Sequence, residues 1–207
     1  AERPMERIGG YSLVTGRTRK LLPDPQETLW VESPTPIEIP IHLAFSQQAA
    51  RAPHAIAVAD GNETWSYGEL EIRTNQLAHW LIHSGVRPGE SVAVYAHRSA
   101  PLVWSLLGIL KAGAAFVVVD PAYPVNRIVH SLEIARARAW IRLEAAGEPP
   151  PPLHAFLDGL RLPQLVLPRG KKSAALETLS AAPPQAAATP DSLAYIAFTS
   201  GSTGAPK

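Results

Sequence analysis

The residues best suited to chemistry lie in one short loop at the end of the chain, Thr199 to Lys207, with the sequence TSGSTGAPK. Its polar positions are hydroxyl side chains, glycines and one lysine: Thr199, Ser200, Gly201, Ser202, Thr203, Gly204 and Lys207. Glycines let backbone N–H groups approach an anion closely, hydroxyls donate further hydrogen bonds, and a lysine adds a point charge. The pattern predicts a loop that holds a polyphosphate.

Two other interpretations of this loop have to be weighed. Its composition alone also fits a flexible Ser/Thr/Gly-rich surface segment. The common P-loop requires a glycine, four residues and then Gly-Lys-Ser/Thr. Here Gly201 and Gly204 are too close together, and Ala205-Pro206 separates the second glycine from the lysine. The spacing therefore excludes the common P-loop.

The element that must position this loop is the stretch directly before it. Leu193 to Thr199 is largely apolar, with the β-favouring pair Tyr195 and Ile196 near its centre. A short apolar run of this kind predicts a buried strand that leads straight into the loop.

Composition limits the class of protein. The chain has 207 residues, 46% of them hydrophobic and 18% charged, which is enough for one sizeable core. A net charge of +1 gives no reason to expect a nucleic acid or an anionic membrane as partner. Because there is no cysteine, disulfides and thiolate metal sites are excluded. The longest apolar run, 112–119, is too short to span a bilayer, and we expect a soluble, cytoplasmic protein.

The chain changes character near residue 40. Residues 1–39 are rich in proline and charge and predict a connector. From residue 40, helical periodicity alternates with short apolar runs, which predicts an α/β domain of layered sheets with flanking helices over 40–207. The expected strands are 55–59, 91–96, 114–119, 139–143, 164–167 and the final 193–199. Residues 181–191 lack periodicity and are expected to form a mobile linker.

Local signals add detail to this layout. Asp60-Gly61-Asn62 predicts a turn that closes a hairpin onto Thr64-Trp65. Ser66 and Glu69 have the spacing of a capping box for the following helix. Ser99 is expected to cap the next helix, which ends near Gly113.

Three stretches together resemble the adenylate-forming enzymes, a family that includes nonribosomal peptide synthetase adenylation domains, acyl-CoA synthetases and luciferases. The loop with Tyr195 before it resembles the phosphate loop of that family. Trp65–Leu70 is similar to its opening motif, and Leu110–Phe116 with Asp120–Pro124 is similar to its second. The resemblance implies the N-terminal part of an acetyl-CoA synthetase-like large subdomain, ending at the phosphate loop.

One departure points to a particular branch. Peptide synthetases usually have proline where this chain has Val118. Val118, the stretch 141–147 and segments within 12–25 resemble the α-aminoadipate reductases instead. Thr203 argues the other way, because the phosphate loop of those reductases commonly carries glutamate at that position.

The resemblance implies a reaction. An amino acid, or another carboxylic acid, would attack ATP to give an acyl-adenylate, with Mg²⁺ accompanying the nucleotide. Thr199–Gly204 and Lys207 would hold the β- and γ-phosphates. The acyl group would then pass to phosphopantetheine on a carrier-protein domain, with condensation or reductase domains as further partners in the same polypeptide. Residues 1–39 resemble the tail of a condensation-type domain.

No residue of this chain is expected to be catalytic, since the family's catalytic lysine and its acid and adenine pockets correspond to sequence beyond Lys207. The chain alone is therefore expected to be inactive. His79 and His83 have a spacing that suits a metal, but no third ligand is identifiable, and no metal site is expected. A non-catalytic folding or domain-interaction unit, or a piece of a stand-alone acyl-CoA ligase, remain alternatives.

Overall fold

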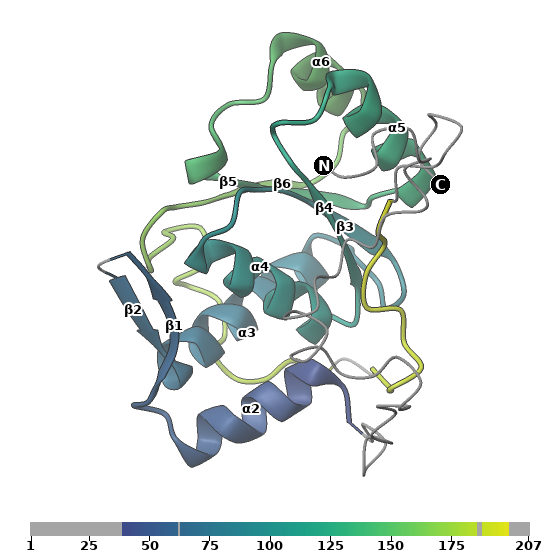
Figure 1. Ribbon diagram of the computed structural model, residues 1–207. Coiled ribbons are helices and arrows are strands. Elements are labelled where there is room, and N and C mark those ends of the chain that lie inside the picture. Colours follow the sequence, from purple (N-terminus) through teal and green to yellow (C-terminus); the bar gives the residue numbers. More distant parts are fainter. Residues whose placement is uncertain (1–38, 62, 186–187, 199–207) are drawn as a thin grey trace, which may run out of the picture. The chain divides into compact units, whose positions relative to one another are not determined.

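The structure is a computed structural model that describes residues 39–61, 63–185 and 188–198 (Figure 1). Its helices are α2 (Ile41–Arg51), α3 (Tyr67–His83), α4 (Ala100–Lys111), α5 (Val125–Ala135), the short 3₁₀ turn η2 (Glu144–Ala146) and α6 (Pro151–Leu160). Its strands are β1 (Ile56–Asp60), β2 (Glu63–Ser66), β3 (Ser91–Tyr95), β4 (Ala115–Val119), β5 (Ala139–Leu143) and β6 (Gln164–Leu167). Within these described ranges, no helix has the length and apolarity needed to cross a membrane.

Four of the strands form a parallel sheet in the order β4-β3-β5-β6. Strand β3 is central to its register, since Val92 pairs with Phe116 of β4 on one side and with Ala139 of β5 on the other. Helices connect successive strands, as parallel pairing requires. The predicted α/β class with a helix-flanked sheet is confirmed.

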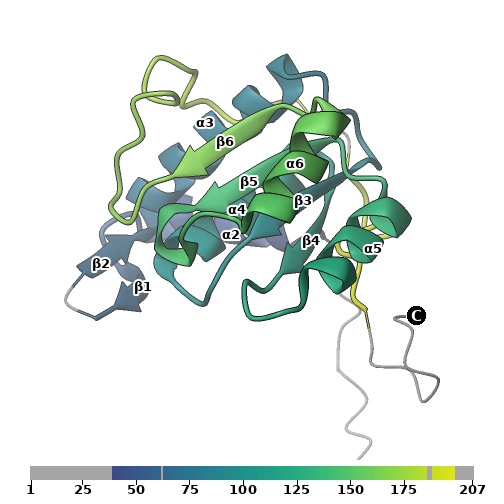
Figure 2. The ribbon, with the colours of Figure 1, turned by 90° about the horizontal axis from the view of Figure 1, so that it is seen from above.

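The sheet is covered on both faces, and each face has its own core. Alternate residues of a strand point to opposite sides, so Val92 and Val94 face α3 and α4, while Ala93 and Tyr95 face α5 and α6. The two helical layers lie on either side of the sheet in Figures 1 and 2. Burial on both faces explains why the central strands contain continuous apolar runs.

The predicted hairpin and capping box are both present. Strands β1 and β2 pair antiparallel, with Asp60 opposite Glu63. At the start of α3, the Glu69 N–H donates to the Ser66 hydroxyl (3.2 Å) and the Ser66 N–H donates to the Glu69 carboxylate (2.8 Å). Gly85 follows the end of this helix, and its φ of +87° is a left-handed conformation that favours glycine.

The prediction that the Ser99 side chain caps α4 is wrong. Ser99 occupies the N-cap position, but its hydroxyl donates to the His97 carbonyl (3.3 Å) and makes no bond to the helix. The Ala100 N–H instead donates to the carboxylate of Asp60, the last residue of β1 (2.8 Å). A carboxylate also complements the positive end of the helix dipole. An acceptor so distant in sequence could not be identified from local spacing.

The prediction of a buried strand at 193–199 is also wrong. Of the described residues in 193–198, only Tyr195 forms a β-bridge, parallel to Phe116 of β4. Leu193 and Tyr195 are 53% and 59% exposed, so the segment is not buried. Its side chains alternate, with Ala194, Ile196 and Phe198 half-buried. The segment has the pattern of an edge with one face on the core, whereas its apolar content predicted a buried strand. Thr199 lies outside the described residues.

The segment expected to be a linker is irregular where it is described. Residues 181–185 and 188–191 form neither helix nor strand. The carbonyls of Ala181 and Ala182 are nevertheless hydrogen-bonded to side chains of α3. The predicted mobility of 181–191 remains a prediction.

Helices α3 and α4 pack closely enough that one position between them admits only glycine. A Cβ added to Gly108 would lie 2.7 Å from Cδ2 of Leu77, a fully buried side chain. We therefore expect Gly108→Ala to lower the free energy of unfolding by about 1–3 kcal/mol through overpacking. Urea denaturation of the purified chain would measure this.

Gly159 of α6 is the matched control, since a Cβ there would meet no atom within 4 Å. Gly159→Ala should leave stability unchanged or raise it by up to about 1 kcal/mol, as alanine is the better helix former. Equal effects of the two substitutions would show that the α3–α4 contact is looser than the structure indicates.

Candidate functional site

The residues predicted to bind phosphate, Thr199, Ser200, Gly201, Ser202, Thr203, Gly204 and Lys207, all lie outside the described residues. The described chain reaches Phe198, immediately before the first of them. The candidate site can therefore be built up from the segment that leads into the loop and from the residues that hold that segment.

The segment 193–198 runs along the edge of the sheet. The Phe116 N–H donates to the Ala194 carbonyl (3.1 Å), and the Ile196 N–H donates to the Phe116 carbonyl (2.9 Å). The Tyr195 ring stacks on the Phe116 ring at 5.7 Å with an interplanar angle of 18°. Because the segment is parallel to β4, it runs toward the carboxyl ends of the strands, the edge where open α/β sheets bind ligands.

A pocket of about 220 Å³ opens beside this segment. Phe116 and Tyr195 contribute aromatic walls, and the Arg127 guanidinium lies 4.2 Å from the centre of the Tyr123 ring. The pocket thus combines flat apolar surface with one fixed cation. Tyr123 belongs to the motif that begins at Asp120, and the Tyr123 N–H donates to the Asp120 carbonyl (3.0 Å), so part of that motif forms a turn.

The carboxyl ends of β3 and β4 bring a histidine and a carboxylate together. Nδ1 of His97 lies 3.7 Å from the carboxylate of Asp120, and both side chains are about half-exposed. Burial raises the pKa of the neighbouring Tyr95 hydroxyl, with a further contribution from the Asp120 charge. An exposed pair of this kind contributes little to stability.

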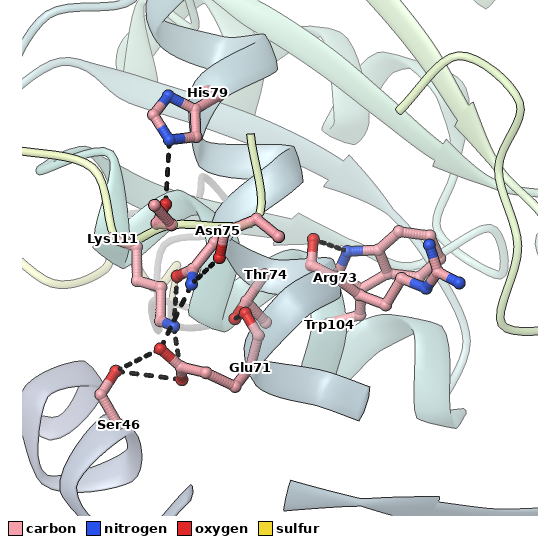
Figure 3. Close-up of polar contacts among 10 residues, drawn as sticks. Ser46, Glu71, Arg73, Thr74, Asn75, His79, Trp104 and Lys111 are labelled. Atoms are coloured by element: carbon pink, nitrogen blue, oxygen red, sulfur yellow. Dashed lines mark hydrogen bonds and ion pairs between the residues drawn. The ribbon is translucent and has the colours of Figure 1, made fainter. Parts of the chain in front are cut away.

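A buried polar cluster lies on the other side of the sheet, where α2, α3 and α4 meet (Figure 3). The Lys111 ammonium lies 2.6 Å from the Glu71 carboxylate and donates to Oδ1 of Asn75 (2.7 Å). The Lys111 side chain is 4% exposed and that of Glu71 is 18% exposed. The Ser46 hydroxyl completes the cluster with a 3.0 Å hydrogen bond to Glu71. Burial lowers the pKa of Lys111, and the bond to Glu71 opposes that shift.

The same face of α3 holds the segment 177–182, which we call the strap. Nδ2 of Asn75 donates to the Ala181 carbonyl (2.8 Å), and Nε2 of His79 lies 3.0 Å from the Ala182 carbonyl. Gln76 adds a longer contact with the Leu179 carbonyl (3.4 Å). The strap is therefore attached to α3 mainly by Asn75 and His79, which lie one helical turn apart.

Sequence reasoning missed this cluster and the strap. Thr74, Asn75 and Gln76 are polar yet buried on a helix whose apolar residues face the core. Three consecutive polar residues (74–76) just before Leu77 were the available signal, but two partners of Asn75, Lys111 and Ala181, lie 36 and 106 residues away. Helical periodicity alone cannot identify such partners.

His79 and His83 lie on one face of α3, with ring centres 6.2 Å apart. Across the part of the chain that the structure describes, no third His, Cys, Asp or Glu joins them in a group that could hold a metal ion. The His79 ring instead contacts the strap, which accounts for its position.

Comparison with known proteins supplies the wider context. Residues 45–207 match the family model described as AMP-binding enzyme. Chondramide synthase of Chondromyces crocatus is 39% identical over 99% of the chain, and one of the linear gramicidin synthase proteins of Brevibacillus parabrevis is 36% identical over all of it. The large subunit of L-2-aminoadipate reductase of Penicillium chrysogenum is 35% identical, again over the whole chain.

Solved structures show the same fold. The nonribosomal peptide synthetase FmoA3 bound to α-methyl-L-serine-AMP superposes with a TM-score of 0.66 over 81% of the chain, at 29% identity, with 18% of its own chain covered. VinN in complex with L-aspartate gives a TM-score of 0.67 over 82% of the chain, at 25% identity, with 43% of VinN covered.

The chain covers only a small part of the length of each of these relatives. The chain spans 5% of the length of chondramide synthase, 4% of the gramicidin synthase protein and 16% of the large reductase subunit. What the chain is similar to is therefore one segment of much longer proteins.

The buried ion pair gives a first test of this region. Glu71→Gln leaves the Lys111 charge buried without its counter-charge, and we expect it to lower the free energy of unfolding by about 3 kcal/mol. Lys111→Met should cost roughly 1 kcal/mol, because Glu71 keeps the Ser46 hydroxyl and some contact with water. Urea denaturation of both variants and of the double mutant would measure these costs. A larger cost for Lys111→Met than for Glu71→Gln would contradict the description of this pair.

His42 gives a test that depends on pH. The side chain is 6% exposed, and burial, followed by the nearby Lys111 charge, lowers its pKa, with Glu71 opposing the shift. Just below pH 6.5 the unfolded chain then binds more protons than the folded chain, so stability is lost as the pH falls through that window. We expect His42→Gln to reduce this slope in urea midpoints measured between pH 5 and 7. The exposed His54→Gln is the control, and an unchanged slope in His42→Gln would contradict the assignment.

Proposed function

The chain belongs to the AMP-binding enzyme family, and on that basis we propose that it supplies the N-terminal part of an adenylation domain. Such a domain activates a carboxylic acid with ATP, giving an acyl-adenylate and pyrophosphate. The observation that carries the proposal is the family match over 45–207, which includes the phosphate-loop sequence TSGSTGAPK at its end. The described part of the chain would act as the scaffold for that loop.

In the proposed reaction, a carboxylate oxygen attacks the α-phosphorus of ATP, and the bond to the β-phosphate oxygen breaks as pyrophosphate leaves. The backbone N–H groups and hydroxyls of Thr199–Gly204 would bind the β- and γ-phosphates, and Lys207 would offset their charge. This set suits phosphate oxygens, since backbone N–H groups and hydroxyls can donate hydrogen bonds to them and the lysine adds a positive charge. Its contribution is positioning and electrostatic stabilisation of the leaving group.

Mg²⁺ would enter with the nucleotide. This ion commonly binds through substrate phosphates and retained waters, with only one or two protein carboxylates. The donors of the loop, hydroxyls and a lysine, fit the phosphates better than they fit the metal. The role proposed for this chain is therefore to hold the phosphates to which the ion is bound.

An amino acid is the proposed substrate. Two structural neighbours support this class, one bound to α-methyl-L-serine-AMP and the other to L-aspartate. The relatives include peptide synthases and a reductase, so we propose that the acyl group passes to phosphopantetheine on a carrier domain. Condensation or reductase domains would be further partners, and residues 1–39 would connect the adenylation domain to what precedes it. The type of these relatives favours a carrier domain over the free CoA of a stand-alone ligase.

The loop can be tested directly in an adenylation domain extended beyond Lys207. We expect Lys207→Ala and Gly201→Val to slow amino-acid-dependent ATP–pyrophosphate exchange by roughly 10²-fold, because each removes transition-state stabilisation or close backbone approach. Thermal midpoints should change little, since neither residue is expected to lie in the core.

Lys172→Ala is the matched control, since Lys172 is exposed in the described part of the chain and distant in sequence from the loop. Its exchange rate should equal that of the wild type. Normal exchange in both loop variants would rule out the phosphate-loop assignment, and the absence of exchange in the wild type with every amino acid would rule out the proposed function.

A further inference from the structure

We infer that Asn75 is a positioning residue, which ties the buried Lys111–Glu71 pair to the strap 177–182 and thereby fixes the chain that leads to the phosphate loop. The part of this inference that concerns ATP rests on the proposed function. The part that concerns the strap rests on the described geometry alone.

The orientation of the Asn75 amide is determined by its neighbours. A lysine ammonium only donates hydrogen bonds, so the atom 2.7 Å from Lys111 must be the amide oxygen. A backbone carbonyl only accepts, so the atom 2.8 Å from Ala181 must be the amide nitrogen. Because the residue is 1% exposed, water cannot readily replace either partner, and loss of one would leave a buried polar group unsatisfied. Asn75 therefore connects a buried cation to one particular carbonyl of the strap.

The cation itself is held in place. The Lys111 ammonium lies between the Glu71 carboxylate and the Asn75 oxygen, 5.8 Å from the centre of the Phe45 ring. Nδ2 of Asn75 also contacts Glu71 (3.3 Å). Moving the Asn75 side chain would remove a partner from a buried charge, which is strongly unfavourable. The position of the strap therefore depends on the ion pair between α3 and α4.

Earlier in the strap, Gln76 makes two longer contacts, with the Glu177 and Leu179 carbonyls (3.5 and 3.4 Å). Leu176, directly before the strap, is fully buried, and the partly buried Leu179 packs against the same core. At its end, the side chains of the described residues that contact the Ala181 and Ala182 carbonyls are Asn75 and His79. Downstream of the strap, the described chain next contacts the sheet at Phe116, through the two backbone hydrogen bonds to the segment 193–198.

The contacts of the strap with α3 and those of the segment 193–198 with Phe116 both precede the loop along the chain. The segment 193–198 has a half-exposed outer face, so its contacts alone provide a weak anchor before Thr199. Releasing the strap would lengthen the stretch of chain between the segment 193–198 and its preceding attachment to α3, which raises the entropy lost when the segment is ordered. A phosphate-binding group displaced by a small distance loses much of its effect. Loss of the Asn75–Ala181 bond should therefore appear first in ATP binding.

Asn75→Asp removes this bond. The new carboxylate can still accept from Lys111 but can no longer donate to the Ala181 carbonyl, and the longer contact with Glu71 (3.3 Å) is lost with it. Ser91→Ala is the control, because the buried Ser91 hydroxyl also donates a hydrogen bond to a backbone carbonyl, that of Ala135, distant from the strap (2.6 Å). His79→Phe is the second variant, which removes the contact with Ala182 from the rim of the cluster, should Asn75→Asp fail to fold.

Hydrogen exchange in the 207-residue chain is the first measurement. The amides of Leu179, Ala182 and Ile196, which donate hydrogen bonds in and beyond the strap, should exchange at least 10-fold faster in Asn75→Asp. They should be unaffected in Ser91→Ala. Unchanged protection of these amides in both Asn75→Asp and His79→Phe would overturn the inference.

ATP–pyrophosphate exchange in the extended domain is the second measurement. We expect Asn75→Asp to raise the KM for ATP about 5-fold while the KM for the amino acid stays unchanged, a split that general destabilisation would not produce. Faster strap exchange with an unchanged KM for ATP would overturn the link to the loop. If the wild-type domain shows no pyrophosphate exchange, the proposed function fails, and the protection of the strap still decides whether Asn75 holds it.

Discussion

The burial of one positive charge constrains how the first three described helices pack. Lys111 ends α4 inside the protein, and an unpaired ammonium there would cost several kcal/mol. It is compensated by Glu71 and Asn75 on α3, while α2 contributes the Ser46 hydroxyl to Glu71 and the Phe45 ring beside the ammonium. In the observed register, all three helices therefore contribute to the compensation of one charge.

The rest of that layer follows from this register. With α3 and α4 fixed, Leu77 packs against Gly108 with no room for a further carbon atom. The Trp65 and Trp104 rings lie 5.8 Å apart, and the Trp104 indole donates to the Arg73 carbonyl (2.7 Å). These contacts form the larger of the two cores and place the hairpin against the helices. The parallel sheet then lies on this core, and β4 presents Phe116 at the edge where the segment 193–198 joins it.

Local interactions in the fold were predictable, and distant ones were not. The capping box at Ser66 and the hairpin at Gly61 depend on residues a few positions apart, so their spacing is visible in the sequence. The Asp60 cap of α4 joins residues 40 positions apart, and the Asn75–Ala181 bond joins residues 106 apart. No local pattern encodes such pairs. The prediction for the segment 193–198 failed for a related reason. An apolar run does not show how many faces of the segment other elements will pack against.

The two motif lysines show why resemblance and geometry answer different questions. Lys111 and Lys207 both belong to stretches that resemble motifs of the family, and a charged residue in such a motif invites assignment to the ligand. Lys111 cannot take that role, because its ammonium is buried and its hydrogen bonds go to Glu71 and Asn75. Its lowered pKa reflects that burial, which Glu71 only partly offsets. Under the proposed function, the charge would act on the phosphates only indirectly, through the chain that it holds in place. Lys207 remains the lysine for which a phosphate is the proposed partner, and on this view the first lysine orders the scaffold that the second requires.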